Sequence, residues 1–162
     1  MDNAFNSPAQ VLDANMKAGV GKAKLPLLKC ILLGLMAGAF IAFGGASSNA
    51  AVHNIANQGL SKTLAGCIFP VGLMMIVFVG GELFTGDCLM IAGVVDKKFG
   101  VLAMIRTLVV VFFSNMAGAV LIATFVYFSG LLDYTDGALG AFTIKIAYGK
   151  ATITPFKAVC SG

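Results

Sequence analysis

The chain has 162 residues, of which 59% are hydrophobic and only 11% are charged, and its mean hydropathy is +0.94. A soluble domain carries roughly 25% charged residues because water must wet its surface. The composition therefore excludes an ordinary soluble domain and predicts an all-α membrane protein. The net charge of +4 does not indicate a nucleic-acid partner, because the lysines are scattered and form no basic stripe.

Residues 7–25 are predicted to form an amphipathic helix. Ser7 is suited to cap this helix, and Pro8 falls at the first helical position, where its missing N–H costs nothing. Apolar side chains recur at helical spacing while the lysines lie off that stripe. The stripe consists of Leu12, Met16, Val20 and Ala23. This pattern is typical of a helix lying in the membrane interface, and it is also compatible with a regulatory gate.

Longer apolar segments are predicted to span the bilayer, which takes about 20 residues each. Span 1 covers residues 27–52 and is rich in glycine and alanine, which let neighbouring helices approach closely. Span 3 covers residues 99–132. Asn115 is its one strongly polar interior residue, and we expect it to make an interhelical hydrogen bond. A loop then leads to residues 151–162, which are predicted to start a fourth span.

The second span, residues 63–95, would be about 50 Å long as one helix, which is too long for a single crossing. Its apolar pattern is interrupted at residues 80–87 by the polar, glycine-rich segment GGELFTGD. Backbone outside a helix survives at membrane depth only where protein buries it or where it lines a watery cavity. We therefore predict a broken span whose second half-helix begins near Asp87, with a solute pathway beside the break.

The polar residues of the break have a second interpretation. Glycines within a span often serve only close packing, and Glu82 could accept the orphan N–H groups of the broken helix. Glu82, Thr85 and Asp87 together favour a pathway, because polar groups at membrane depth are costly. His53 is the only histidine and lies in a polar connection, and the four cysteines lack C-x-x-C spacing. We therefore expect no metal and no cofactor, and interpret the cysteines as small buried apolar residues.

Lysine and arginine are distributed unequally between the two ends of the predicted spans. One side carries Lys17, Lys22, Lys24, Lys29, Lys97, Lys98 and Arg106. The opposite side carries Lys62, Lys145 and Lys150. Cytoplasmic flanks have an excess of basic residues. We therefore expect a multi-pass protein of the inner (cytoplasmic) membrane with its N-terminus in the cytoplasm.

Two stretches within the second span, FPVGL at residues 69–73 and GELFTGD at residues 81–87, resemble the formate/nitrite transporter family. The resemblance covers nearly the whole chain from Ser7. Its further matches are GVGKA at 19–23, SNMAGA at 114–119, and Lys150 ahead of AVC at 158–160. The resemblance implies an aquaporin-like bundle of six transmembrane helices in two inverted repeats, with the second and fifth spans broken. It also implies a homo-oligomer, a pentamer with one pore through each protomer.

The same resemblance implies roles for single residues. The apolar constrictions would be lined by Phe69, Leu73, Leu83 and Phe84. Thr85 would offer its hydroxyl between them, with Lys150 in the outer vestibule and Lys22 in the inner one. The chain matches the first repeat and the beginning of the fourth span. We expect the second repeat, which carries the family's central pore histidine, outside these residues, and His53 does not replace that histidine.

The resulting hypothesis is a channel or transporter for a small monovalent anion of a weak acid, with hydrosulfide favoured and formate or nitrite next. The family carries formate, nitrite, lactate and hydrosulfide, and the sequence is most similar to the clostridial-type hydrosulfide channels. Vestibule lysines would gather the anion, with Glu82 beside the pathway, and it would cross as the neutral acid because a bare anion is costly to desolvate. Two alternatives stay open: a non-conducting structural membrane subunit, and an intramembrane enzyme using Glu82 and Asp87. We expect no enzyme, because the spans hold no histidine and no nucleophile–base pair.

Overall fold

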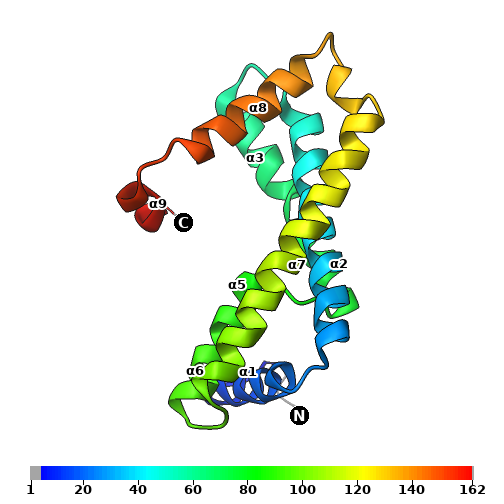
Figure 1. Cartoon of the computed structure of the whole chain (residues 1–162). Coiled ribbons are helices and arrows are strands. Elements are labelled where there is room, and N and C mark those ends of the chain that lie inside the picture. The colour runs from blue at the N-terminus through cyan, green and yellow to red at the C-terminus, as the bar shows by residue number, and fades with distance from the viewer. Residues whose placement is uncertain (1–4, 162) are drawn as a thin grey trace.

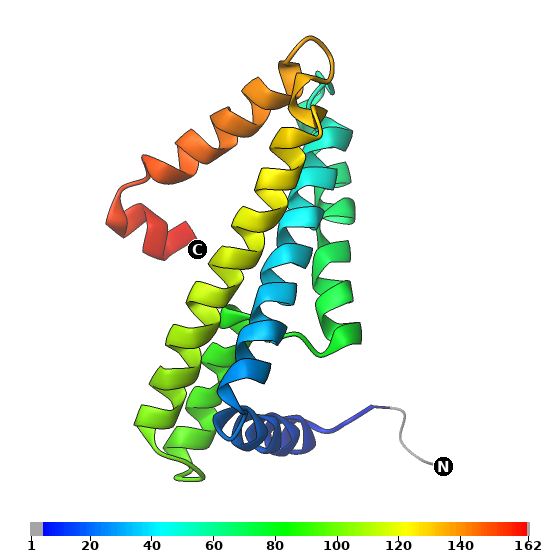
Figure 2. The same cartoon turned by 45° about the vertical axis from the view of Figure 1, so that its right-hand side comes forward.

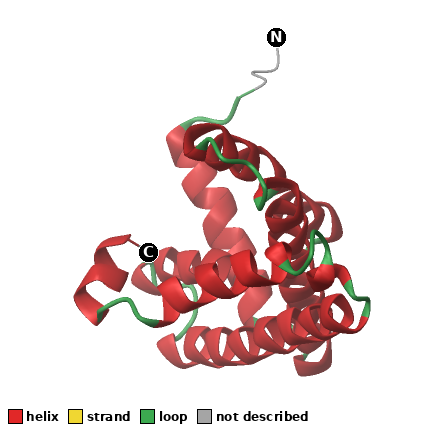
Figure 3. Ribbon diagram, turned by 90° about the horizontal axis from the view of Figure 1, so that it is seen from above, coloured by secondary structure: helices red, strands yellow, loops and turns green. Residues whose placement is uncertain are grey.

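The computed structural model describes residues 5–161, and all regular structure in that range is helical (Figure 3). The elements, in chain order, are α1 Pro8–Ala23, α2 Leu27–Val52, α3 Gln58–Ile68, α4 Pro70–Val79, α5 Phe84–Asp87, η1 Cys88–Met90, α6 Ile91–Val95, α7 Val101–Phe128, η2 Leu131–Asp133, α8 Ala138–Ala151 and α9 Pro155–Ser161. The body consists of α2, α7 and a rod made of α3 and α4 (Figure 2). α1 lies across one end of this body, and α8 starts at the other end (Figure 1).

Three helical stretches are long and apolar enough to cross a membrane. α2 has 26 residues with a mean hydropathy of 2.1, the α3–α4 rod has 22 with 2.0, and α7 has 28 with 2.2. At 1.5 Å per residue each stretch exceeds the hydrocarbon thickness of about 30 Å. Their outer faces expose large apolar side chains such as Phe78 and Phe128, as expected where lipid or another membrane helix covers them. The expected all-α membrane fold is confirmed.

The cysteines depart from the sequence-based expectation. Cys30 is buried, but Cys67, Cys88 and Cys160 are exposed. An apolar stretch of sequence does not distinguish the side of a helix that packs on protein from the side that faces lipid, because both sides are apolar. The expectation of four buried cysteines is therefore wrong for three of them.

α1 begins as its sequence predicts. Ser7 accepts a hydrogen bond from the backbone N–H of Gln10, whose side chain accepts one from Ser7 N–H in return, and Pro8 is the first helical residue. This reciprocal capping box satisfies two donors that the helix itself leaves unpaired. The helix is also anchored on the protein: Asn15 Nδ2 donates to the carbonyl of Leu89 at 3.2 Å. α1 therefore has a fixed place against the part of the second span that follows the break.

Glycines bring α2 and α7 into backbone contact. A Cβ atom built at Gly34 would lie 2.7 Å from the Ser114 Cβ, and one at Gly38 would overlap the backbone of Asn115. From the other side, a Cβ at Gly118 would overlap the carbonyl of Leu35. Close approach of this kind is how membrane helices gain packing energy when lipid supplies no hydrophobic driving force. It also brings Asn115 within reach of the α2 backbone.

Substitution of Gly38 by alanine is expected to destabilise the protein by about 2 kcal/mol, because an added methyl group must push two backbones apart. Gly45→Ala is the matched control on the same helix, since a Cβ there meets nothing within 4 Å. That control should be neutral or slightly stabilising, because alanine favours the helix. Thermal unfolding in detergent measures both variants. Equal stability of the two would contradict the close α2–α7 contact.

The second span is broken where the sequence predicts it, although the chain resumes its helix earlier than expected. Gly80 ends α4 with φ 70°, a left-handed conformation suited to glycine. The N–H groups of Gly80 and Gly81 both donate to the Ile76 carbonyl. The helix restarts at Phe84 and not near Asp87, because Leu83 C=O already accepts the Asp87 N–H at 2.9 Å. The two half-helices lie on different sides of α2 (Figure 2).

The connection after α7 contains a helix that the sequence did not predict. Residues after Asp133 were expected to form a loop as far as Lys150, but α8 covers most of this segment. Its start carries no capping side chain, because Gly137 precedes it with φ 80°. Leu139 is buried at the beginning of the helix. α8 therefore depends on tertiary contacts for its place and gives no start signal in sequence.

Candidate functional site

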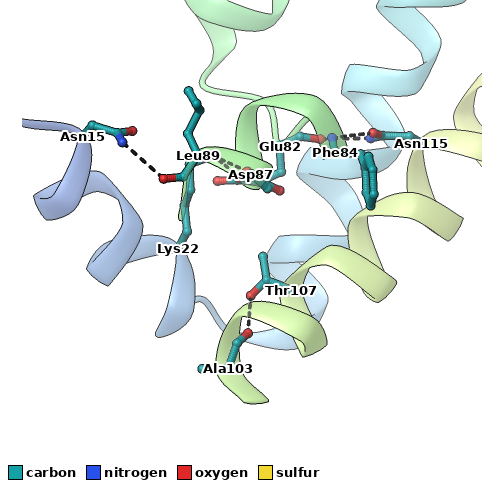
Figure 4. Close-up of polar contacts among 9 residues, drawn as sticks. All are labelled: Asn15, Lys22, Glu82, Phe84, Asp87, Leu89, Ala103, Thr107 and Asn115. Atoms are coloured by element: carbon teal, nitrogen blue, oxygen red, sulfur yellow. Dashed lines mark hydrogen bonds and ion pairs between the residues drawn. The ribbon is translucent and has the colours of Figure 1, made fainter. Parts of the chain in front are cut away.

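Asn115 of α7 holds the break in the second span together. Its Oδ1 accepts the N–H of Phe84 at 3.0 Å, and its Nδ2 donates to the carbonyl of Glu82 at 2.9 Å (Figure 4). The same Nδ2 donates to the carbonyl of Gly34 at 2.7 Å. The N–H of Glu82 donates to the Leu33 carbonyl of α2 at 3.3 Å. Backbone groups freed from the helix are thus satisfied within the protein, as membrane depth demands. The expected interhelical hydrogen bond of Asn115 is confirmed.

Three charged side chains meet beside the break. The Nζ of Lys22, from α1, donates to Glu82 and to Asp87 Oδ1, the latter at 2.6 Å (Figure 4). Glu82 is only 6% exposed and Asp87 is fully buried. We call Lys22, Glu82 and Asp87 the inner triad. It joins the first helix of the chain to both sides of the broken span.

The inner triad brings together one cation and two carboxylates. Burial by itself lowers the pKa of Lys22, but the hydrogen bonds to Asp87 and Glu82 outweigh burial and raise its pKa above the ordinary value. Lys22 therefore stays charged. The Oδ2 atom of Asp87 is buried without a hydrogen-bond partner among the described residues. The ammonium group of Lys22 is already paired with the carboxylates of Glu82 and Asp87. It is therefore not an unpaired cation to which an incoming anion could bind.

A cavity of about 420 Å³ opens between α4, the break and α5. Its lining includes four of the residues singled out in the sequence, from three separate segments: Lys22, Leu73, Leu83 and Thr85. The remaining lining residues are Ile76, Val77, Gly80, Gly81 and Gly86. A cavity with an apolar wall, one hydroxyl and one ammonium group suits a small polar solute. We call it the break cavity.

Other predicted site residues lie apart from the break cavity. Phe69 is at the bend between α3 and α4, and Lys150 is exposed in the last turn of α8. Phe84 turns toward α7, where its ring meets Phe112 edge to face with centroids 5.6 Å apart. Glu82 is not among the lining residues, but its carboxylate pairs with Lys22, which is one of them. Of the expected site residues, the break cavity therefore contains only Lys22, Leu73, Leu83 and Thr85.

Asp87 is the residue of this site whose role sequence reasoning missed. It was noted as a polar residue of the break, but its partnership with Lys22 bridges 65 positions of sequence. One signal could have found it: two carboxylates in an apolar span need a cation, and ionisable groups in a membrane usually pair. Lys22 lies on the predicted interfacial helix next to the first span, where its side chain could supply the cation that the two carboxylates need.

Comparison with known proteins defines the class to which this fold and site belong. The family described as formate/nitrite transporter matches residues 9–162. A probable formate transporter of Methanothermobacter thermautotrophicus is 39% identical over 94% of this chain and 61% of its own length. A formate channel of Bacillus thuringiensis is 34% identical over 91% of this chain and 57% of its own length. A solved structure of an FNT family ion channel matches with a TM-score of 0.69 at 21% identity, over 75% of this chain and 50% of that chain.

The chain belongs to the formate/nitrite transporter family, a family of membrane channels and transporters and not of enzymes. It spans about 60% of the length of the two relatives. The structural match supports the aquaporin-like helical fold with a broken second span.

Proposed function

We propose that the chain forms the first half of a pore for small monovalent anions of weak acids. The observation that carries the proposal is the break cavity, whose lining includes Thr85 and Lys22 together with the apolar residues Leu73 and Leu83. Because the relatives are longer, the complete transporter is this chain together with a part that supplies a second repeat. That repeat would close the pathway on its open side.

The inner triad changes the role proposed for Lys22. An ammonium group that already binds two carboxylates has no surplus positive charge with which to attract an anion from a distance. Its role is local: it holds α1 on the break and contributes one polar wall to the break cavity. The hydroxyl of Thr85 then offers a hydrogen bond within an otherwise apolar passage. Passage as the neutral acid avoids the desolvation cost that the bare anion meets at Leu73 and Leu83.

The proposed outer side carries Lys150, which is exposed and free to concentrate anions by Coulomb attraction. Basic residues support a cytoplasmic N-terminus. The helix α1 and the turn between α6 and α7 lie at the end of the bundle opposite α8 (Figure 1). That turn contains Lys97 and Lys98, and Arg106 follows near the beginning of α7. We propose an inner-membrane location with spans at 27–52, 63–95 and 99–132, and 151–162 starting a fourth.

A homopentamer is the proposed assembly, on the strength of the family resemblance. The exposed apolar faces of α4 and α7 support contact with lipid or with another protomer. Formate is the first substrate to test, because the relatives are named for formate. Hydrosulfide and nitrite follow, since each is small, monovalent and the anion of a weak acid.

Thr85→Ala is expected to reduce the initial rate of formate uptake about tenfold. A hydrogen bond between uncharged groups is worth roughly 0.5–1.5 kcal/mol, and the upper end of this range, about 1.4 kcal/mol, corresponds to a factor of ten. The measurement is uptake into vesicles that contain the complete transporter. Thr124→Ala is the matched control, because Thr124 lies on α7 and bonds only the Val120 carbonyl of its own helix. Unchanged uptake in Thr85→Ala, with both variants folded, would remove Thr85 from the pathway.

A further inference from the structure

The turn between α7 and α8 has an unusual backbone. Thr135 has φ 56° and Asp136 has φ 54°, followed by Gly137 at 80°. Residues other than glycine rarely adopt this left-handed region, and a β-branched threonine least of all. Such a conformation persists only where the surrounding structure holds it. Backbone bonds within the turn, from Gly137 N–H to the Asp133 carbonyl and from Ala138 N–H to the Thr135 carbonyl, support it, and contacts from outside add to them.

His53, at the end of α2, makes the contact that fixes this turn. Its Nδ1 lies 2.9 Å from the carbonyl of Ala50, and its Nε2 lies 2.5 Å from Thr135 Oγ1. A carbonyl only accepts, so Nδ1 carries a proton and donates to Ala50, which leaves Nε2 to make the hydrogen bond with the Thr135 hydroxyl. The ring also meets Tyr134 edge to face, with centroids 5.8 Å apart. α2 thus orients the imidazole, and the imidazole holds the turn.

A second contact lies about one turn earlier on α2. The Nδ2 of Asn49 donates to Thr143 Oγ1 of α8 at 3.3 Å. Near the beginning of α8, Leu139 is buried, and Gly140 packs on the Leu132 carbonyl, 3.0 Å from the position that a Cβ would take. From Ile144 onward every residue of α8 is exposed. The helix is therefore held at its first half only.

We infer that His53 and Asn49 of α2 form a two-point clasp that sets the direction of α8 and thereby positions Lys150 at the outer mouth of the pathway. Lys150 lies seven residues beyond Thr143, about 10 Å along the helix. A change of direction at the clasp is therefore carried to the lysine. The inference rests on the proposed function where it concerns Lys150. The clasp residues touch no part of the break cavity and act only through α8.

Loss of the clasp should weaken capture of the anion and leave its passage intact. A displaced lysine no longer raises the anion concentration at the outer mouth, so the apparent KM for formate uptake should rise about fivefold. The maximal rate should stay within about twofold, because the break cavity is unchanged. The variants are His53→Ala and Thr135→Val, the second of which removes only the hydroxyl and keeps the shape of the side chain.

Hydrogen exchange of residues 138–151 gives a second measurement that needs no substrate. In the complete transporter, both variants should speed exchange of α8 about tenfold. His53→Gln keeps an acceptor near the position of Nε2 and should restore KM to within about twofold of the unmodified protein. Thr152→Val is a matched control, since Thr152 bonds only the Tyr148 carbonyl of its own helix. It should change neither quantity.

Lys150→Gln separates the clasp from the role proposed for Lys150. It should raise KM without changing the exchange of α8. If Lys150→Gln has no effect while His53→Ala speeds exchange, the clasp stands and the role of Lys150 is overturned. If Lys150→Gln raises KM while His53→Ala and Thr135→Val leave exchange and KM unchanged, the clasp is overturned. If His53→Ala does not fold, the exchange of α8 and the KM of Thr135→Val test the clasp.

Discussion

Lys22→Met is expected to lower the free energy of unfolding by about 3 kcal/mol. Removing one partner from a buried ion pair costs roughly 3–5 kcal/mol, because the remaining charge is left uncompensated. Two carboxylates are left here, and Asp87 is fully buried. The lower end of the range applies because the Lys22 side chain is 25% exposed and water can enter. Denaturant or thermal unfolding in detergent measures the loss.

The same change should release α1 from the break. Lys17→Met is the matched control, because Lys17 lies on the same helix and pairs only with the exposed Asp13. That control should leave stability unchanged. The triple variant Lys22→Met, Glu82→Gln, Asp87→Asn removes all three charges together and should recover most of the lost stability. A triple variant no more stable than Lys22→Met would show that the loss does not come from uncompensated charge.

Asn115→Leu is expected to cost about 4 kcal/mol of stability. Leucine has nearly the same shape, but the N–H of Phe84 and the carbonyl of Glu82 lose their partner, and the Gly34 carbonyl keeps only its bond within α2. Each buried polar group left unsatisfied costs about 1–3 kcal/mol, and no water is at hand at membrane depth to replace the amide. Because the groups belong to the break itself, the loss should be accompanied by faster hydrogen exchange at residues 80–87.

Thr124→Val provides the comparison for Asn115→Leu on the same helix. It also replaces a polar side chain by an apolar one, but the Thr124 hydroxyl bonds only its own helix. Its effect should stay within about 0.5 kcal/mol. A cost below about 1 kcal/mol for Asn115→Leu would contradict the bonding that the structure assigns to this side chain.

Local chemistry accounts for the features that the sequence predicted well. The cap at Ser7 and Pro8 depends on residues within one helical turn. The break at Gly80 follows from a polar, glycine-rich interruption of an apolar run. Asn115 was identifiable because a lone amide in an apolar span needs partners. In each case the residues that indicate the feature lie within one short stretch of sequence.

Features that depend on distant contacts were not predictable in the same way. The pairing of Lys22 with Glu82 joins residues 60 positions apart, and neither residue alone specifies the other. α8 follows a left-handed glycine and has no capping side chain, so nothing local marks its beginning. Leu83 and Phe84 were both expected to line the apolar constrictions. Consecutive residues point in different directions once the helix begins: Leu83 lines the break cavity, and Phe84 packs against Phe112.

Formate flux through vesicles containing the complete transporter tests the central claim most directly, with nitrite and hydrosulfide compared in the same assay. The account predicts saturable uptake of at least one of these anions, well above that of empty vesicles and lowered by Thr85→Ala. Flux no higher than in empty vesicles for all three anions would contradict the pore and favour a non-conducting membrane subunit.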